Sequence, residues 1–200
     1  MTTTTQKNRR TLLLIFLTPV MVLIPFAIIY WMADEGLMEY ETFNRGELIN
    51  PPIQISDLGL ETKSGNALDY SQPDHLWSLV VIGDRFCSGA CEKLLYLVRQ
   101  SNTALGKKMN KARRYYISLD GEVDTQLSQL IEKEHPKLTV LTGEQAKVLG
   151  LFPQALAPNR FYLVDRGGWI MMSYHAPDLQ AHTLNALGKD VLKDMNRLIK

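Results

Sequence analysis

The sequence predicts an α/β fold, in which a mixed central sheet carries helices on both faces, preceded by one N-terminal transmembrane helix. Three observations lead to this expectation. An uncharged apolar stretch fills residues 11–32. After it, segments typical of strands alternate with segments typical of helices, which favours a sheet covered by helices. Two cysteines, Cys87 and Cys91, lie where the first buried strand gives way to a helix, and the sequence has no others.

The apolar stretch is long enough to cross a membrane. Its roughly 22 uncharged residues match a bilayer core of about 30 Å. Lys7, Arg9 and Arg10 precede it, and Asp34 and Glu35 follow it. Because basic residues stay on the cytoplasmic side, we expect the N-terminus inside and the rest outside. A cleaved signal peptide is the alternative, but its apolar core usually has about 7–15 residues and an A-x-A site, which is missing here.

These features divide the chain into four parts. We expect a cytoplasmic tail over 1–10, a transmembrane anchor over 11–32, a polar linker over 33–52 and a single globular domain over 53–200. In a Gram-negative bacterium this is a single-pass inner (plasma) membrane protein with a periplasmic domain, where disulfides can form. A domain of about 150 residues buries enough surface to need no disulfide staple. The cysteine pair is therefore expected to serve a function.

The charge balance argues against a nucleic-acid partner. Three of the 22 basic residues precede the apolar stretch, which leaves 19 against 21 acidic residues. A nucleic-acid-binding domain usually carries a basic patch or stripe. The expected partners are the membrane and other proteins.

The order of elements predicts the fold. Residues 77–82 are almost continuously apolar, as in a buried parallel strand. Residues 53–60 alternate loosely, and a turn at 165–168 separates two strand-like runs, which indicates a hairpin. The remaining strands are expected at 114–119, 138–141, 161–164 and 169–172. One helix is expected to start near residue 89 or 90, and others at 124–134, 143–149 and 177–200. This order, βαβ followed by ββα, is that of a thioredoxin-like fold.

The cysteine pair suits sulfur and copper chemistry. A helix N-terminus favours the thiolate form of a cysteine. Side chains four residues apart on a helix face the same way, with Cβ atoms about 5–6 Å apart. This spacing allows both sulfurs to hold one soft ion such as Cu(I), or to close a disulfide after a small adjustment. An inert disulfide is the alternative.

Several motifs occur in the order of one known family. They are FCSGAC at 86–91, YISLD at 116–120 with DT at 124–125, LTG at 141–143, FYLVDRGG at 161–168 and GELINPP at 46–52. In these motifs the chain resembles the Sco/SenC family, and most closely the small membrane-anchored cytochrome oxidase-associated proteins of Gram-negative bacteria. The first motif corresponds to that family's C-x-x-x-C loop.

The resemblance implies a role in respiration. Sco-like proteins help to build the copper site of cytochrome c oxidase subunit II, either by carrying copper on two cysteines and a histidine or by reducing the target's cysteines. The resemblance therefore implies that Cys87 and Cys91 form a redox pair and are possible copper ligands. The implied partners are subunit II or other oxidase assembly factors.

The chain departs from the family at the histidine. That position falls on Ala157, or on Pro158 after a one-residue slip, and neither side chain can ligate copper. His175 ends the second strand of the hairpin, which returns toward the start of the first, so it is a candidate replacement ligand; an ordinary loop histidine is the alternative. Pro158 also resembles the cis-proline of thiol oxidoreductases, which predicts a cis Ala157–Pro158 bond.

Other side chains that are able to bind metal or act as acids have simpler explanations. Met171 and Met172 are neighbours in a strand and point to opposite faces, so core packing is expected. Asp124 precedes a helix and is expected to cap it. Of the other histidines, His75 is expected at the sheet end opposite the cysteines, and His135 at a helix end.

Three functions stay open from the sequence. The first is a membrane-anchored, Sco-like assembly factor for cytochrome c oxidase that acts through Cys87 and Cys91. The second is a periplasmic thiol–disulfide oxidoreductase, the only enzyme class among the three. The third is an oxidase-associated scaffold subunit without catalytic activity.

Overall fold

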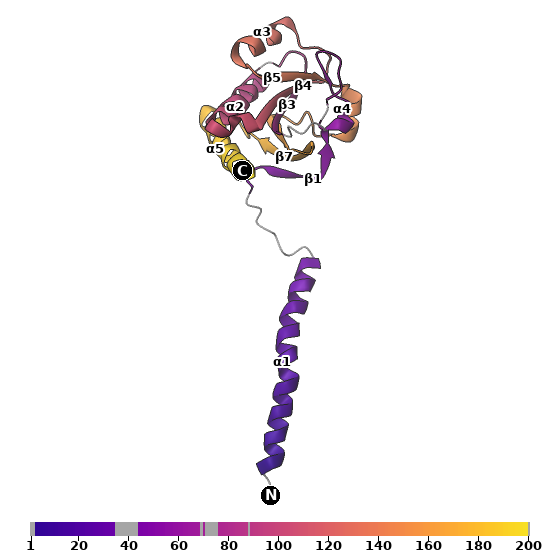
Figure 1. Ribbon diagram of the computed structural model, residues 1–200, viewed down its shortest axis with the longest axis vertical. Coiled ribbons are helices and arrows are strands. Elements are labelled where there is room, and N and C mark those ends of the chain that lie inside the picture. The colour runs from indigo at the N-terminus through magenta and orange to yellow at the C-terminus, as the bar shows by residue number, and fades with distance from the viewer. Residues whose placement is uncertain (1–2, 35–43, 69, 71–75, 88, 200) are drawn as a thin grey trace. The chain divides into compact units, whose positions relative to one another are not determined.

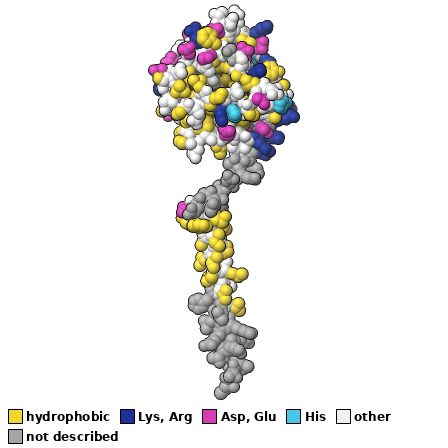
Figure 2. All heavy atoms as spheres, turned by 180° about the vertical axis from the view of Figure 1, so that it is seen from behind, with side chains coloured by type: hydrophobic (Ala, Val, Ile, Leu, Met, Phe, Trp, Pro, Cys, Tyr) yellow, Lys and Arg dark blue, Asp and Glu magenta, His cyan; other side chains and the backbone are white. Residues whose placement is uncertain are grey.

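The computed structural model describes residues 3–34, 44–68, 70, 76–87 and 89–199. The chain forms two compact units, Met1–Phe43 and Asn44–Lys200. In the first, helix α1 runs over Thr3–Asp34 and includes Pro19 and Pro25. In its described part the large apolar side chains are exposed, for example Phe26 at 68 %, and Figure 2 shows them gathered along the helix.

No helix in the described part of the chain combines the length and apolarity that crossing a bilayer requires. The anchor predicted for residues 11–32 is therefore not confirmed, and it stays a prediction.

The second unit is built on a seven-stranded mixed sheet in the order β1-β7-β6-β3-β4-β5-β2 (Figure 1). The three central parallel strands are β3, β4 and β5. Antiparallel neighbours complete both sides. The strands are β1 (Glu47–Gln54), β2 (Glu61–Thr62), β3 (Trp77–Gly83), β4 (Ala112–Ser118), β5 (Leu138–Thr142), β6 (Arg160–Val164) and β7 (Trp169–His175).

Helices cover both faces of this sheet, which confirms the predicted α/β class. The first face packs against α2 (Ala90–Ala104), α3 (Thr125–Glu134) and α5 (Ala181–Leu198). The second packs against η1 (Ile55–Leu58) and α4 (Gln145–Leu151). A short 3-10 helix, η2 (Gly106–Lys111), leads from α2 into β4.

The core is divided by the alternation of side chains in the strands. In β3, Leu79 and Val81 face the α2 side, while Val80 and Ile82 face the α4 side. All four are buried. This two-sided burial explains why the strand reads as a continuous apolar run in the sequence.

One boundary differs from the sequence prediction. Residues 47–52, expected in the linker, form most of β1, which pairs with β7. The strand passes through Pro51 and Pro52 because it lies at the edge of the sheet and its register shifts between Leu48 and Ile53. Proline lacks the N–H that an interior strand needs and is tolerated at such edges and bulges.

Candidate functional site

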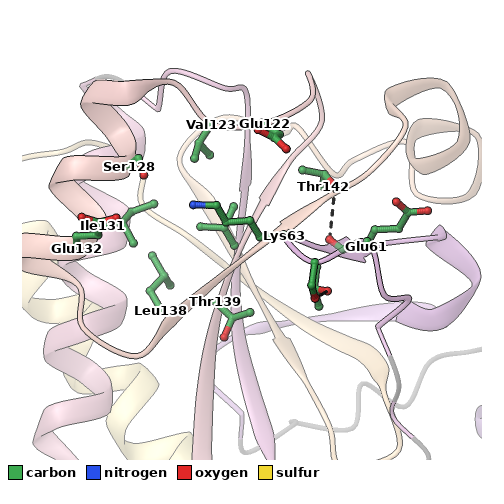
Figure 3. A pocket seen from close by; sticks show the side chains of 14 residues that line it. Glu61, Lys63, Glu122, Val123, Ser128, Ile131, Glu132, Leu138, Thr139 and Thr142 are labelled. Atoms are coloured by element: carbon green, nitrogen blue, oxygen red, sulfur yellow. Dashed lines mark hydrogen bonds between the residues drawn. The ribbon is translucent and has the colours of Figure 1, made fainter.

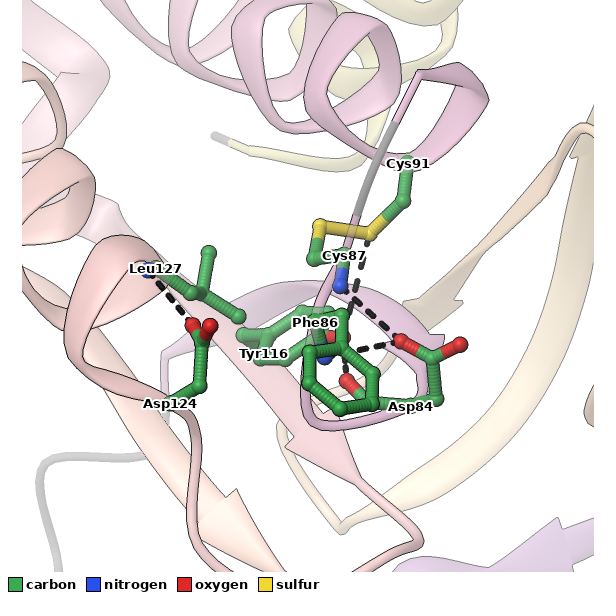
Figure 4. The surroundings of a disulfide bond; sticks show 7 residues. All are labelled: Asp84, Phe86, Cys87, Cys91, Tyr116, Asp124 and Leu127. Carbon is green, nitrogen blue, oxygen red and sulfur yellow. Dashed lines mark hydrogen bonds between the residues drawn. A yellow bond between two sulfur atoms is a disulfide. The ribbon is translucent and has the colours of Figure 1, made fainter.

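The two cysteines lie at the carboxyl end of β3, in the loop that leads into α2 (Figure 4). β3 ends at Gly83 and α2 begins at Ala90. Cys87 and Cys91 are joined as a disulfide, with their Cα atoms 5.0 Å apart. The helix is capped by the backbone of Gly89, with no side-chain hydrogen bond, so the positive end of the α2 dipole faces the cysteine loop.

Asp84 organises this loop. Its Oδ1 accepts hydrogen bonds from the backbone N–H groups of Phe86 and Cys87, each at 2.9 Å. This is the local turn that aspartate side chains stabilise. Cys87 sits in the left-handed region with φ 44°, a conformation that costs a non-glycine residue about 1–2 kcal/mol. The Asp84 bonds help to hold it there.

Tyr116 lies beneath the disulfide. It belongs to β4, where it pairs in register with Val81, and its side chain is fully buried. Its hydroxyl donates a hydrogen bond to the backbone oxygen of Asp84 and lies 3.8 Å from Cys91 Sγ. Burial, and to a lesser degree Asp84, raises the pKa of Tyr116 well above its ordinary value. The phenol therefore stays protonated at physiological pH, and because its one proton is donated to Asp84, its oxygen faces Cys91 Sγ as an acceptor.

The glycine at the end of β3 leaves room for that phenol. A Cβ atom on Gly83 would lie 2.6 Å from the Tyr116 hydroxyl oxygen, closer than atoms pack. Two backbone bonds then tie the cysteine loop to the segment between β4 and α3: Leu119 N–H donates to Gly83 O, and Asp124 N–H to Arg85 O, each at 3.0 Å. Asp124 also accepts from Leu127 N–H at 2.8 Å, which confirms the predicted helix cap.

The two sulfurs differ in accessibility. Cys87 is 1 % exposed, whereas Cys91 is half-buried. Beside them Phe86 is 56 % exposed, and the Arg85 guanidinium lies 5.4 Å from the centre of its ring. Glu92 follows Cys91 in the first turn of α2 and is exposed. The site therefore offers one accessible sulfur next to an apolar ring.

His175 is at the same end of the sheet but is not grouped with the cysteines. It is the last residue of β7 and pairs with Arg160 of β6, so β6 lies between it and β3, whose end carries the cysteine loop. Within the described residues, no three His, Cys, Asp or Glu side chains come together as metal ligands. The copper site of Cys87, Cys91 and His175 stays a prediction.

The cis-proline hypothesis is wrong. The cis peptide bond found among the described residues joins Asn50 to Pro51, so the Ala157–Pro158 bond is trans. That segment follows α4 in a series of turns, whose geometry a trans proline satisfies. Met172 is buried in the core as expected, and His75 lies outside the described residues.

Two residues of the site were not predicted from the sequence. Asp84 carries a usable signal, because an aspartate two and three residues before the N–H groups of a tight turn is a common turn former. Tyr116 carries no local signal. Its place under the disulfide follows from the parallel pairing of β3 with β4, a contact between segments far apart in the sequence.

Comparison with known proteins gives the same fold class. The family model described as "Transmembrane-like, thioredoxin-like, C-terminal domain" matches residues 77–200. No curated protein matches the sequence significantly.

Solved structures give the same fold. ScoI of Bradyrhizobium japonicum with copper bound is 20 % identical with a TM-score of 0.51, over 75 % of this chain and 99 % of that one. Yeast Sco1 is 19 % identical with a TM-score of 0.53, over 74 % and 92 %. A SCO1/SenC family lipoprotein of Bacillus anthracis is 14 % identical with a TM-score of 0.56, over 76 % and 99 %. At these identities the likeness shows the thioredoxin-like fold.

Proposed function

The chain belongs to the transmembrane-like, thioredoxin-like family, and we propose that it is a membrane-anchored, Sco-like factor for assembly of the copper site in subunit II of respiratory cytochrome c oxidase. The observation that carries this proposal is the Cys87–Cys91 pair, in which Cys87 lies in the loop after β3 and Cys91 in the first turn of α2, with Cα atoms 5.0 Å apart. Structural neighbours with this fold include Sco proteins determined with copper bound.

Copper would be the cargo of the reduced protein. Once the disulfide is reduced, Cys87 and Cys91 offer two thiolates whose Cα atoms lie 5.0 Å apart in the oxidised form, and soft thiolates select Cu(I). The N-terminus of α2 favours the thiolate form electrostatically. His175 is the proposed third ligand, and it would have to approach from the end of β7.

The disulfide itself favours a second candidate, thiol–disulfide exchange with a partner protein. Reduced Cys91, as the more accessible thiolate, attacks one sulfur of a partner disulfide, and the other partner sulfur leaves as a thiolate. Cys87 thiolate then attacks Cys91 Sγ in the mixed disulfide. This releases the second partner thiolate and closes the disulfide seen here, so the partner gains two electrons and this chain loses two.

We further propose that α1 anchors the chain in the inner membrane, with the N-terminus cytoplasmic and the second unit periplasmic. Support comes from the uncharged residues 11–32 and from the three basic residues before them. The exposed apolar side chains of α1, such as Leu23 and Phe26, are what a lipid environment would cover. Labelling of single cysteines placed at each end of α1, in a Cys87→Ser/Cys91→Ser background, tests the orientation.

The first test measures Cu(I) binding by the reduced full chain in detergent, against a chromogenic competitor. Tight binding of one ion that is lost in Cys87→Ser and in Cys91→Ser supports copper handling. A further loss in His175→Ala identifies the third ligand, with the exposed His182→Ala as the matched control. Absence of tight binding contradicts the copper role.

The second test uses cells that lack the gene and depend on the oxidase. The double variant Cys87→Ser/Cys91→Ser is expected not to restore oxidase activity, and added copper or added reductant then distinguishes delivery from thiol reduction. Full restoration by the double variant would contradict both roles and leave the scaffold function.

A further inference from the structure

A groove lies at the far edge of the sheet from β1, between β5, α3 and the turn after β2 (Figure 3). Its volume is about 760 Å³. Its lining comes from three places: β5, one side of α3 with the segment before it, and residues 61–65. The groove does not include either cysteine.

The edge of β5 is only half covered. β2 pairs with Leu141 and Thr142 and then turns away, since Thr62 N–H bonds to Asn66 O and Gly65 N–H to Thr62 O. Among the described residues, no strand pairs with Leu138, Thr139 or Val140 on the side of β5 that faces away from β4. These three residues span about 10 Å.

The backbone N–H and C=O groups of Val140 point away from β4, out of this edge of the sheet. Gly143 N–H donates to Ser118 O at the end of β4, so residue 143 faces β4. N–H and C=O groups of a strand alternate between its two neighbours, which turns those of residues 142 and 140 the other way. The N–H and C=O groups of Thr142 face β2, with which this residue pairs. The N–H and C=O groups of Val140 face the groove. Such free edge groups are a template for an added strand.

The side chains of the groove set what it can hold. The floor is apolar and consists of half-buried or buried side chains that belong to the core of the first face: Val123, Ile131, Leu138 and Val140. The rim is acidic, with Glu61, Glu122 and Glu132 exposed and one lysine, Lys63, among them. None of these four charged groups forms an ion pair within the described residues.

We propose that this groove binds an extended segment of a partner protein, which adds to β5 as a strand and carries apolar side chains alternating with lysine or arginine. The free Val140 groups specify an extended backbone. The floor accepts every second side chain, and the acidic rim favours basic residues at the others. A second copy of this chain fits less well, because its own β5 edge would bring the same three glutamates.

The groove is also connected to the cysteine loop. Glu122 and Val123 line it, and the next residue, Asp124, donates its N–H to Arg85 O, two residues before Cys87. A strand bound at β5 would therefore contact the segment that supports the cysteine loop. This inference stands on the groove alone and holds whichever chemistry Cys87 and Cys91 perform.

Binding is tested with a fluorescein-labelled probe, the hexapeptide Lys-Val-Lys-Val-Lys-Val amide, and the full chain in detergent. Fluorescence anisotropy gives the affinity, and the amide chemical shift of Val140 reports the site. We expect saturable binding with a shift at Val140, about tenfold weaker in Val140→Pro, which removes the outward N–H while sparing the bonds to β4. The peptide Glu-Val-Glu-Val-Glu-Val amide should not bind.

Charge reversal provides a test that does not depend on the fold of the proline variant. Glu122→Lys/Glu132→Lys is expected to weaken the probe about tenfold or more at low salt, and less at high salt. Asp57→Lys/Glu144→Lys, with the same net charge at exposed positions outside the groove, should bind as the native chain does. Equal weakening in both, no shift at Val140, or self-association of the chain in place of probe binding would overturn the proposal.

Discussion

The two faces of the central sheet differ in what they bury. On the face covered by α2, α3 and α5, the buried residues include Cys87 and the ionisable Arg114, His135 and Asp194. The face covered by η1 and α4 is filled mainly by aliphatic and aromatic side chains, with Phe152 and Tyr162 packed edge to face at 4.8 Å between ring centres. The buried polar residues that strand alternation places there, Ser78 and Ser173, carry no charge.

Because of this difference, the residues that affect the chemistry of the site are expected mainly on one face of the sheet. Burying a polar group is costly unless it is hydrogen-bonded, so a face with several of them needs specific partners. The other face depends mainly on dense packing. We therefore expect substitutions on the α4 face to change stability alone, and substitutions on the α2 face to change reactivity or pH dependence as well.

The largest expected effect is on the α4 face. Phe152 is fully buried, and Phe152→Ala should lower the free energy of unfolding by about 3–5 kcal/mol through lost burial and the cavity left behind. Urea denaturation measures the loss. The reduction potential of the Cys87–Cys91 disulfide should stay unchanged, and a shifted potential would show that the two faces are not separate.

The next effect concerns Asp194 of α5. Its Oδ2 accepts bonds from Arg45 N–H at 2.8 Å, Gly46 N–H at 3.2 Å and the Tyr174 hydroxyl at 3.1 Å. Asp194→Ala leaves these donors without their acceptor and should cost about 1–3 kcal/mol, with earlier proteolysis ahead of β1.

The matched control is Asp190→Ala on the same helix, where the carboxylate forms only a surface pair with Lys193 at 3.8 Å. It should cost less than about 0.5 kcal/mol. Similar losses for the two variants would mean that the buried network around Asp194 contributes little.

A smaller effect, on chemistry, is expected at Tyr116. Tyr116→Phe removes the hydroxyl that lies 3.8 Å from Cys91 Sγ. The pKa of the reduced Cys91 thiol should fall by about one unit or less, because this hydroxyl oxygen accepts from the thiol, and its removal takes away a hydrogen bond that stabilises the neutral form. Because the reduced thiol loses a hydrogen bond that the disulfide does not make, the disulfide should be harder to reduce, by up to about 30 mV.

Iodoacetamide kinetics against pH and equilibration with glutathione measure these two shifts. Tyr115→Phe serves as the control, since Tyr115 precedes it in β4 and faces the α4 side. Equal shifts in the two variants would contradict a specific role for the Tyr116 hydroxyl.

The smallest effect is a pH dependence from His135. Burial, then Arg99 and Arg114, lowers its pKa below the ordinary value of about 6.5. The unfolded chain therefore takes up this proton at a higher pH than the folded chain does. Stability from this group is complete above about pH 6.5 and falls as the pH drops toward the folded-state pKa.

Thermal unfolding between about pH 5 and pH 8 measures this slope. In His135→Gln the part of the slope due to this group should vanish, while His182→Gln, exposed on α5, should keep it. A slope that His135→Gln leaves unchanged would assign it to other groups.

Local signals in the sequence were sufficient for the fold class and for the place of the cysteine pair. The apolar run at 77–82 matches β3, the turn at 165–168 joins β6 to β7, and Asp124 caps α3 as predicted. Each depends on side-chain periodicity or on turn and cap chemistry within a few residues. The histidine ligand was harder to predict, because a metal site needs groups from separate strands.

By itself the sequence determined that an α/β domain of the thioredoxin type follows an apolar N-terminal stretch, with two cysteines at a strand–helix junction. Only the tertiary structure decided that β1 runs through Pro51 and Pro52 against β7, that Tyr116 lies under Cys91, and that β5 keeps an open acidic edge. The physical reason is sequence separation. Periodicity and capping are set by neighbours along the chain, whereas these three features depend on which strands pair and in which register.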